Sequence, residues 1–259
     1  MKIIVHPDYQ PLLSTLGDIV NGKYSVEHVY CNRRNTVERV VLPDGRKVVV
    51  KRYKMPNSIN RWVYGVLRKS KARRAYEFGL LLIEKGVDTP KPIAYMEQRL
   101  HGAMTWSWSV SEYVDATPFS ELYASLRQLA AEGDTQAEQQ IQKLRQSLTQ
   151  YVVQLEEKNV VPGDFNHANI LVTEVEDDYH FSLVDINRMH IDKQATLHST
   201  MKMYSQFCRS YQDALDFLPL YAEARNIDYD KCMYIFACQR NHLLKRKQRK
   251  LVAHRMFGE

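Results

Sequence analysis

The chain has 259 residues and a formal net charge of +6, and 44% of its residues are hydrophobic and 25% charged. This is the composition of a globular protein, long enough to form one large domain or two lobes. Its start has too short an apolar run for a signal peptide, and no uncharged stretch is long enough to span a bilayer. The excess of basic residues indicates an anionic partner, such as a membrane surface, a nucleic acid or a phosphorylated substrate.

The cysteines and histidines argue against a structural metal site. The four cysteines contain no C-x-x-C pair, and the nine histidines show no zinc-binding spacing. We therefore interpret the cysteines as reduced thiols and expect a cytoplasmic protein.

The first part of the chain predicts a sheet and a helix. A short helix is expected at 7–20, and a longer one at 68–85, where apolar residues recur at helical spacing up to Gly86. The alternating or β-branched segments predict five strands, at 24–29, 36–42, 46–51, 93–98 and 104–113. We assign residues 1–113 to an N-terminal lobe with an antiparallel five-stranded sheet and one main helix.

From Pro118 onward the pattern becomes mainly helical. Residues 198–225 and 230–252 are interpreted as helices. A further helix at 137–158 carries one apolar face, made of Ile141, Leu144, Leu148, Val152 and Leu155. We assign residues 114–259 to a mainly helical C-terminal lobe, so that the whole chain is a single α+β domain with two lobes.

The most informative stretch is 160–172, an apolar run followed by a polar turn and a β-branched strand. A second apolar strand leads to Asp185, and the polar segment 174–178 between the two strands predicts a hairpin turn. The hairpin brings Asp164 and Asn169, before its first strand, to the same end as Asp185. Phosphoryl transfer needs such a group, because an Asp must orient the attacking hydroxyl while an Asn and a second Asp hold Mg²⁺. The D-x-x-x-x-N spacing and the second acid match the catalytic loop and metal-binding Asp of protein kinases.

Other residues fit a nucleotide site of the same kind. Lys51 follows three consecutive valines, where a kinase places the strand lysine that contacts the phosphates. Glu77, inside the long helix, is the better candidate to orient that lysine, and Glu84 is the alternative. The segment 111–115 is interpreted as a hinge that presents backbone groups of Glu112 and Val114 to adenine.

The last predicted helix is strongly basic. Its basic residues are Arg240, Lys245, Arg246, Lys247, Arg249, Lys250 and Arg255, with leucines interleaved. One interpretation is an ordinary solvated surface; the other is a patch for anionic lipid or a phosphorylated glycolipid. No motif for RNA or DNA binding accompanies the charge, so no nucleic-acid partner is expected.

With these residues in order, the chain resembles the protein-kinase-like superfamily over residues 24–190. Within it, the chain is most similar to the lipopolysaccharide core kinases, the Kdo kinase or WaaP-like family. Three stretches carry the resemblance: Val50-Lys51-Arg52-Tyr53-Lys54, the helix exit at 84–94, and Asp164-Phe165-Asn166-His167-Ala168-Asn169-Ile170-Leu171. As in that family, the chain lacks a long activation segment after Asp185.

Two departures from the protein-kinase pattern have consequences. No G-x-G-x-x-G precedes Lys51, so the loop 32–35 would cover the phosphates, with the charge of Arg33 or Arg34 in place of glycine-rich backbone. Pro162-Gly163 stands where kinases have His-Arg, which removes the usual link to a phosphorylated activation loop. We therefore expect constitutive activity.

The resemblance implies Mg²⁺- and ATP-dependent phosphorylation of a sugar hydroxyl, of Kdo or heptose, in the lipopolysaccharide inner core or a lipid A precursor. It also implies a peripheral location on the cytoplasmic face of the inner membrane, with a lipid A–Kdo glycolipid as acceptor. One alternative is a small-molecule or protein Ser/Thr kinase of the same fold. Another is a pseudokinase that binds anionic lipid or a partner protein without turnover. The sequence leaves the oligomeric state open.

Overall fold

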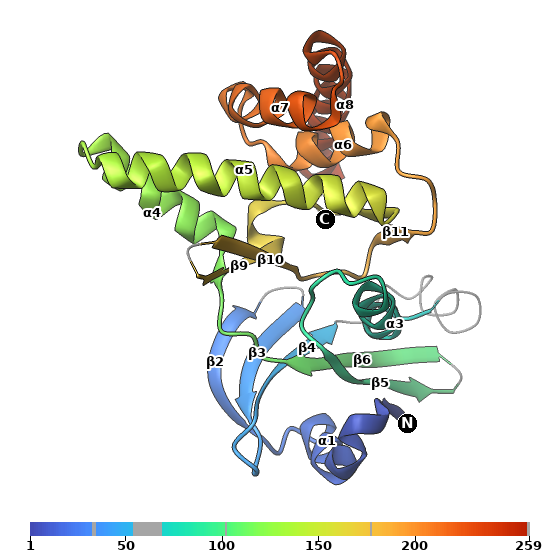
Figure 1. The fold of residues 1–259 in the computed structure, drawn as a ribbon. Helices are drawn as coiled ribbons and strands as arrows, with labels where there is room; N and C mark the ends of the chain where they lie inside the picture. Colours follow the sequence, from blue (N-terminus) through green and yellow to red (C-terminus); the bar gives the residue numbers. More distant parts are fainter. Residues whose placement is uncertain (33–34, 54–68, 102, 177, 258–259) are drawn as a thin grey trace. The chain divides into compact units, whose positions relative to one another are not determined.

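The structure is a computed structural model, and it describes residues 1–32, 35–53, 69–101, 103–176 and 178–257. The chain divides into two compact units (Figure 1). Unit 1 comprises Met1–Asp115 with Asp185–Arg188, and unit 2 comprises Ala116–Val184 with Met189–Glu259. Within the described ranges, no helix is both long and apolar enough to cross a membrane.

Unit 1 is built on an antiparallel sheet of six strands in the order β1-β5-β6-β4-β3-β2. The strands are β1 (Lys2–Val5), β2 (Ser25–Asn32), β3 (Asn35–Val41), β4 (Lys47–Tyr53), β5 (Pro92–Leu100) and β6 (Ala103–Glu112). The expectation of five strands is thus wrong by one. The additional strand, β1, has only four residues and forms by pairing with β5, which a local pattern does not reveal.

One face of this sheet is covered by the start of the chain. The 3₁₀ segment η1 (Pro7–Leu12) leads into α1 (Leu13–Val20), where a single helix was expected. The two segments meet at a kink whose backbone is non-helical at Tyr9. Leu16 and Ile19 are fully buried in a cluster that includes Val48 and Val50 of β4.

The opposite face of the sheet carries α3 (Lys71–Glu84), as Figure 1 shows. Its underside forms a second cluster with the sheet, made of Tyr53, Ala72, Tyr76 and Tyr95. Because side chains alternate along a strand, Lys51 lies on the same face of β4 as Tyr53. The sheet therefore directs the predicted phosphate-contacting lysine toward the α3 side.

Unit 2 is mainly helical, with α4 (Phe119–Ala131), α5 (Thr135–Glu157), α6 (Leu197–Phe207), α7 (Tyr211–Arg225) and α8 (Tyr229–Phe257). The predicted apolar face of the α5 segment is confirmed, because all five of its named residues are buried. Helix α6 lies against α8, and α7 contacts both α5 and α8. The described side chains of α8 beyond Arg240 are almost all exposed.

The remaining strands of unit 2 position the catalytic stretch. β9 (Ile170–Val175) and β10 (Asp178–Leu183) form the predicted hairpin, with Ile170 opposite Leu183, and β7 (Thr117–Pro118) pairs with β9. β8 (Val160–Pro162) pairs with β11 (Met189–Ile191). The short 3₁₀ turn η2 (His167–Asn169) precedes β9, and the Val184 N–H donates to the Asn169 carbonyl at 2.9 Å. The hairpin thus joins Asn169 to the residue just before Asp185.

Candidate active site

The loop from Gly163 to Asn166 connects β8 to η2 and holds its polar side chains outward. Phe165 and His167 point into unit 2, with exposed fractions of 1% and 5%, whereas Asp164 is exposed. His167 packs on Phe207 of α6, with 4.2 Å between ring centroids, and on Phe119 of α4 at 5.0 Å. The alternation of inward aromatic rings and outward polar groups presents the Asp164 carboxylate to solvent.

Two asparagines fix the groups around Asp164. Asn166 Nδ2 donates to Asp164 Oδ1 at 3.0 Å, which restrains the carboxylate. Asn169 Nδ2 donates to the Asp164 main-chain carbonyl, also at 3.0 Å. Because this bond uses the amide nitrogen of Asn169, its Oδ1 oxygen faces away from the loop backbone and is the atom suited to a hard cation. The structure therefore brings the predicted Asp164 and Asn169 together in one hydrogen-bonded turn.

A residue that sequence reasoning missed holds the same loop from α6. The Phe165 N–H donates to Gln206 Oε1 at 3.0 Å, and Gln206 Nε2 donates to the Gly163 carbonyl at 3.3 Å. Gln206 lies 42 positions beyond Asp164 in the sequence, inside an ordinary amphipathic helix. No local pattern marks it.

His167 is neutral at physiological pH. Burial lowers the pKa of His167 to about 4, and the nearby charge of Arg209 acts in the same direction. Its Nε2 atom is buried without a hydrogen-bond partner within the described residues. The ring thus serves as part of the aromatic core beneath the loop, with its charge suppressed.

In unit 1, the structure brings Lys51 close to Asp185. Burial lowers the pKa of Lys51, and the Asp185 carboxylate opposes that shift by its charge. The two were predicted separately, as a phosphate contact and a metal ligand. Their proximity puts a positive charge near a carboxylate, a combination that suits a metal-bound polyphosphate.

Asp185 itself has an unusual backbone. Its φ of 54° lies in the left-handed region, which costs a non-glycine residue about 1 kcal/mol or more. Asn187 Nδ2 donates to Asp185 Oδ1 at 2.5 Å, and both Asn187 and the intervening Ile186 are buried. The sharp turn therefore leaves the Asp185 side chain exposed while its neighbours anchor it.

Glu77 has partners other than the predicted one. Its carboxylate accepts from Lys69 Nζ and from Arg73 Nε, each at 2.8 Å. Burial raises the pKa of Glu77, but the bonds from Lys69 and Arg73 outweigh it and leave a net lowering. Among the described residues, no ion pair joins Lys51 to Glu77, and the alternative, Glu84, is exposed at the end of α3. The role of Glu77 toward Lys51 stays a prediction.

The predicted hinge, residues 111–115, begins within the last two residues of β6. The Glu112 N–H donates to the Lys91 carbonyl at 2.9 Å, and the Glu112 side chain accepts from the Tyr9 hydroxyl at 2.5 Å. The Tyr113 N–H donates to the Lys47 carbonyl at 3.2 Å. For Val114 N–H, no bond is found within the described part of the chain. The Glu112 side chain is thus tied to Tyr9 of unit 1, and the contact of Glu112 and Val114 with adenine stays a prediction.

The predicted Arg33 and Arg34 lie outside the described residues. The described ranges contain no group of three or more His, Cys, Asp or Glu side chains able to hold a metal. The donors predicted for Mg²⁺ are instead one amide and one carboxylate, Asn169 and Asp185. Their oxygens fit a hard cation that keeps several of its waters.

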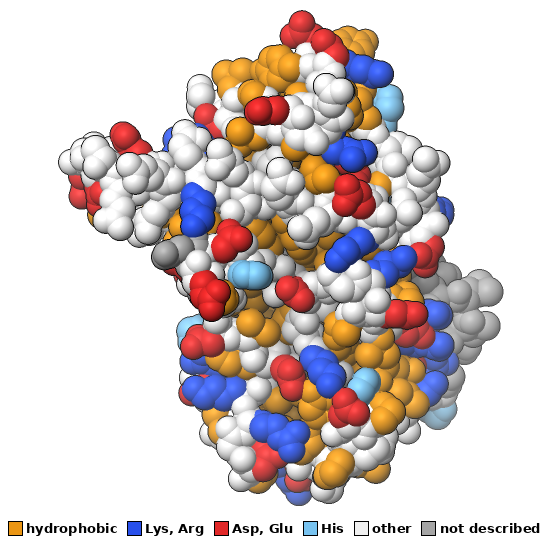
Figure 2. Space-filling view, in the orientation of Figure 1, with side chains coloured by type: hydrophobic (Ala, Val, Ile, Leu, Met, Phe, Trp, Pro, Cys, Tyr) orange, Lys and Arg blue, Asp and Glu red, His pale blue; other side chains and the backbone are white. Residues whose placement is uncertain are grey.

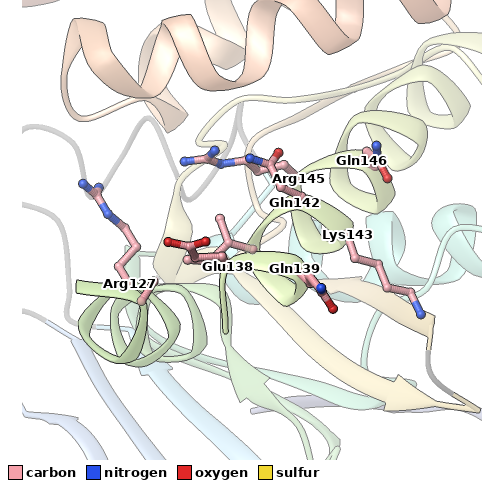
Figure 3. A pocket seen from close by; sticks show the side chains of 9 residues that line it. Arg127, Glu138, Gln139, Gln142, Lys143, Arg145 and Gln146 are labelled. Atoms are coloured by element: carbon pink, nitrogen blue, oxygen red, sulfur yellow. The ribbon is translucent and has the colours of Figure 1, made fainter. Parts of the chain in front are cut away.

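A separate hollow lies between α4 and α5 of unit 2 (Figure 3). It has a volume of about 880 Å³ and is lined by Arg127 and Ala130 of α4 and by α5 residues from Glu138 to Gln146. Arg145 binds the Tyr123 hydroxyl and Asp216, and Arg127 lies 3.8 Å from Asp213. These arginines are thus already paired with α7 carboxylates, so we assign the hollow no ligand.

Comparison with known proteins matches the chain to one sequence family and to solved structures of similar fold. A sequence model described as the Lipopolysaccharide kinase (Kdo/WaaP) family matches residues 30–214, well over half of the chain. None of the curated proteins compared with the chain matches it. The solved structure of WaaP in complex with acyl carrier protein is similar with a TM-score of 0.63 and 18% identity, covering 97% of this chain and 99% of that one. Rio2 kinase from Chaetomium thermophilum, in its ADP/Mg²⁺-phosphoaspartate complex, gives a TM-score of 0.46 and 16% identity, covering 94% and 78%.

Proposed function

Because the chain belongs to the lipopolysaccharide kinase (Kdo/WaaP) family and is therefore a kinase, we propose that it phosphorylates a Kdo or heptose hydroxyl, using ATP. The acceptor sugar belongs to the lipopolysaccharide inner core or to a lipid A precursor. The single observation that supports this most directly is the loop around Asp164, with an outward carboxylate and an oriented Asn169 amide.

Asp164 is the catalytic base in this proposal. Its carboxylate is exposed and held by Asn166, so it can accept the proton of an attacking sugar hydroxyl and orient that hydroxyl toward the phosphate. General-base catalysis of this kind contributes roughly 10²–10⁴-fold to turnover. Asn166 keeps the carboxylate in one rotamer and thereby reduces the cost of alignment.

Lys51 contacts the ATP phosphates, and Asn169 and Asp185 would hold Mg²⁺. When bound, Mg²⁺ would supply positive charge that offsets the negative charge developing on the phosphates during transfer. Lys51 is half-buried and close to Asp185, so a bound phosphate and the carboxylate would share its positive charge. Glu112 and Val114 would bind adenine through their backbone groups. Glu77 would orient Lys51 only after leaving Lys69 and Arg73.

The acceptor is proposed to be a glycolipid at an anionic membrane surface, and α8 is the element suited to reach it. On the face of unit 1 seen in Figure 2, acidic and basic side chains are interspersed, so no single-sign patch forms there. Helix α8 instead carries five exposed cations within six positions, Lys245, Arg246, Lys247, Arg249 and Lys250. Leu244 and Leu251 beside them are 42% and 59% exposed. Basic residues near an anionic surface contribute about 1 kcal/mol each, and exposed leucines add apolar contact.

Arg240 does not belong to that patch. Its guanidinium donates to the carbonyls of Ser205, Cys208 and Arg209 and so caps the end of α6. The side chain of Arg255 lies outside the described residues. The proposed lipid-facing set is therefore smaller than the basic run in the sequence.

The function is tested by mass spectrometry of a lipid A–Kdo acceptor after incubation with Mg-ATP. One added phosphate is expected, with turnover lowered by about 10²-fold or more in Asp164→Asn while the affinity for ATP is kept. Transfer to a protein or free small molecule alone would favour the alternative kinases. ATP binding without any transfer would favour a pseudokinase. Near-normal turnover of Asp164→Asn would remove the base assignment.

The membrane proposal has its own test. Replacing the five α8 cations with Gln should weaken co-sedimentation with anionic, glycolipid-bearing vesicles and raise the KM for the acceptor, with the KM for ATP unchanged. Exposed charges are screened over about 10 Å at 0.1 M salt, so wild-type binding should fall as salt rises. A matched control replaces five exposed lysines elsewhere, Lys23, Lys143, Lys193, Lys202 and Lys231. Because the WaaP structure contains acyl carrier protein, that protein is added as a competitor; displacement of the vesicles by it would indicate a protein partner on α8.

A further inference from the structure

The side-chain amide of Gln206 spans the backbone on both sides of Asp164. Its Oε1 accepts from the Phe165 N–H at 3.0 Å, and its Nε2 donates to the Gly163 carbonyl at 3.3 Å. One planar amide thus acts as acceptor to the residue after Asp164 and as donor to the residue before it. All of these residues lie in unit 2.

The loop needs such a partner because it is irregular. Its backbone leaves the pairing of β8 with β11 at Pro162 and enters the η2 turn only at His167. Polar backbone groups near a buried core are costly unless they are hydrogen-bonded. Gln206 satisfies two of them, and in doing so it fixes the peptide planes that set the direction of the Asp164 side chain.

Gln206 is itself rigidly held. Its neighbours Ser205 and Phe207 on α6 are 1% and 0% exposed. The end of the helix is capped by Arg240 of α8, whose guanidinium donates to the Ser205 and Cys208 carbonyls at 2.8 and 2.6 Å. A side chain that projects from such a fixed helix end can hold a loop to within a fraction of an ångström, which proton transfer requires.

We propose that Gln206 is a positioning residue for phosphoryl transfer, which acts through Asp164 by fixing the backbone on either side of it. The inference rests on the proposed role of Asp164 as the base. It assigns to Gln206 no contact with ATP or acceptor. Its loss should therefore lower kcat and leave the KM for ATP unchanged.

Three variants test whether kcat depends on the donor and the acceptor of the Gln206 side chain. Gln206→Leu removes the donor and the acceptor, and we expect kcat to fall by about 10- to 100-fold. Gln206→Glu keeps the acceptor but loses the donor while it is ionised, and a protonated carboxyl group can again do both. The kcat of Gln206→Glu, relative to wild type, should therefore rise as the pH is lowered from about 7 to about 5. Gln212→Leu, at an exposed position on α7, is the matched control and should keep wild-type kcat.

A double variant shows whether the effect passes through Asp164. In an Asp164→Asn background, adding Gln206→Leu should change kcat less than twofold, because the group being positioned is already lost. A full 10- to 100-fold additional loss would overturn the inference, as would wild-type kcat in both Gln206 variants. If Gln206→Leu does not fold, the pH profile of Gln206→Glu decides alone, and a ratio that does not change with pH refutes the proposal. A fully active Asp164→Asn would instead refute the base assignment, and the two failures are thus distinct.

Discussion

Gly79 offers a sharp test of the packing between α3 and the sheet. It lies inside α3, and a Cβ atom placed on it would be 2.4 Å from Pro92 Cγ, 3.4 Å from Pro92 Cδ and 3.5 Å from Ile186 Cδ1. Carbon atoms pack best at about 3.5–4.0 Å, so the first contact is too close by about 1 Å. The proline ring is closed and cannot rotate away. Gly79→Ala therefore requires α3 to move away from β5.

The magnitude follows from two opposing contributions. Overpacking a filled site costs about 1–3 kcal/mol, whereas replacing a glycine inside a helix with alanine gains up to about 1 kcal/mol. A Cβ atom added to Gly17, inside α1, would have no other atom within 4 Å, so Gly17→Ala has only the gain. The helix contribution is common to both variants. The difference between their stabilities therefore isolates the overpacking, and we expect Gly79→Ala to be the less stable by about 1–3 kcal/mol.

Urea denaturation followed by circular dichroism measures this difference as a shift of the midpoint at constant slope. Gly17→Ala should raise the midpoint and Gly79→Ala should lower it. Because Ile186 directly follows Asp185 and touches the same site, Gly79→Ala should also increase the Mg²⁺ concentration needed for half-maximal activity. If Gly79→Ala is as stable as Gly17→Ala, the described approach of α3 to Pro92 is wrong.

Two further predictions concern ionisable side chains. Asp185→Asn weakens the proposed metal ligand, so added Mg²⁺ should partly restore its turnover. Lys51→Ala removes the proposed phosphate contact, which added metal does not replace. Equal rescue of both variants in a Mg²⁺ titration would show that the two roles are not separate. His167 has its pKa lowered from 6.5 to about 4, so between these values only the unfolded chain takes up the proton, and stability falls as the pH is lowered. Between about pH 7 and about pH 5 this loss is about 2 kcal/mol, and His167→Phe should show a smaller fall in Tm than wild type over that range. The exposed His198→Phe is the control and should keep the wild-type slope.

The kinase-like α+β fold was predictable because its signals are local, and it is confirmed here. The hairpin of β9 and β10 follows from two apolar strands and a polar turn, and the buried face of α5 follows from helical periodicity. Strand β1 escaped prediction because four residues hold too little pattern, and its pairing with β5 joins residues far apart in the sequence, such as Lys2 and Glu97.

The side-chain partners were less predictable than the elements. Asp164, Asn169 and Asp185 are marked by their spacing in the chain, but spacing does not say which group binds which. Glu77 could be placed on its helix from the sequence, and Arg73 is its i,i+4 neighbour there, yet its contact with Lys69 depends on the path of the chain before α3. Gln206 is an amide in an amphipathic helix, and only the fold brings it to the Asp164 loop.

The left-handed backbone at Asp185 also limits which residues evolution can place there. At a φ of 54°, most side chains clash with their own backbone, and only Gly, Asn and Asp adopt this conformation routinely. A descendant of this gene that abandoned catalysis would therefore drift at this codon toward Asn or Gly long before it accepted Ala, Val or Leu. Asn or Gly at this codon in a homologue would mark loss of the proposed metal-binding carboxylate with the turn preserved, and a branched residue would mark a remodelled turn.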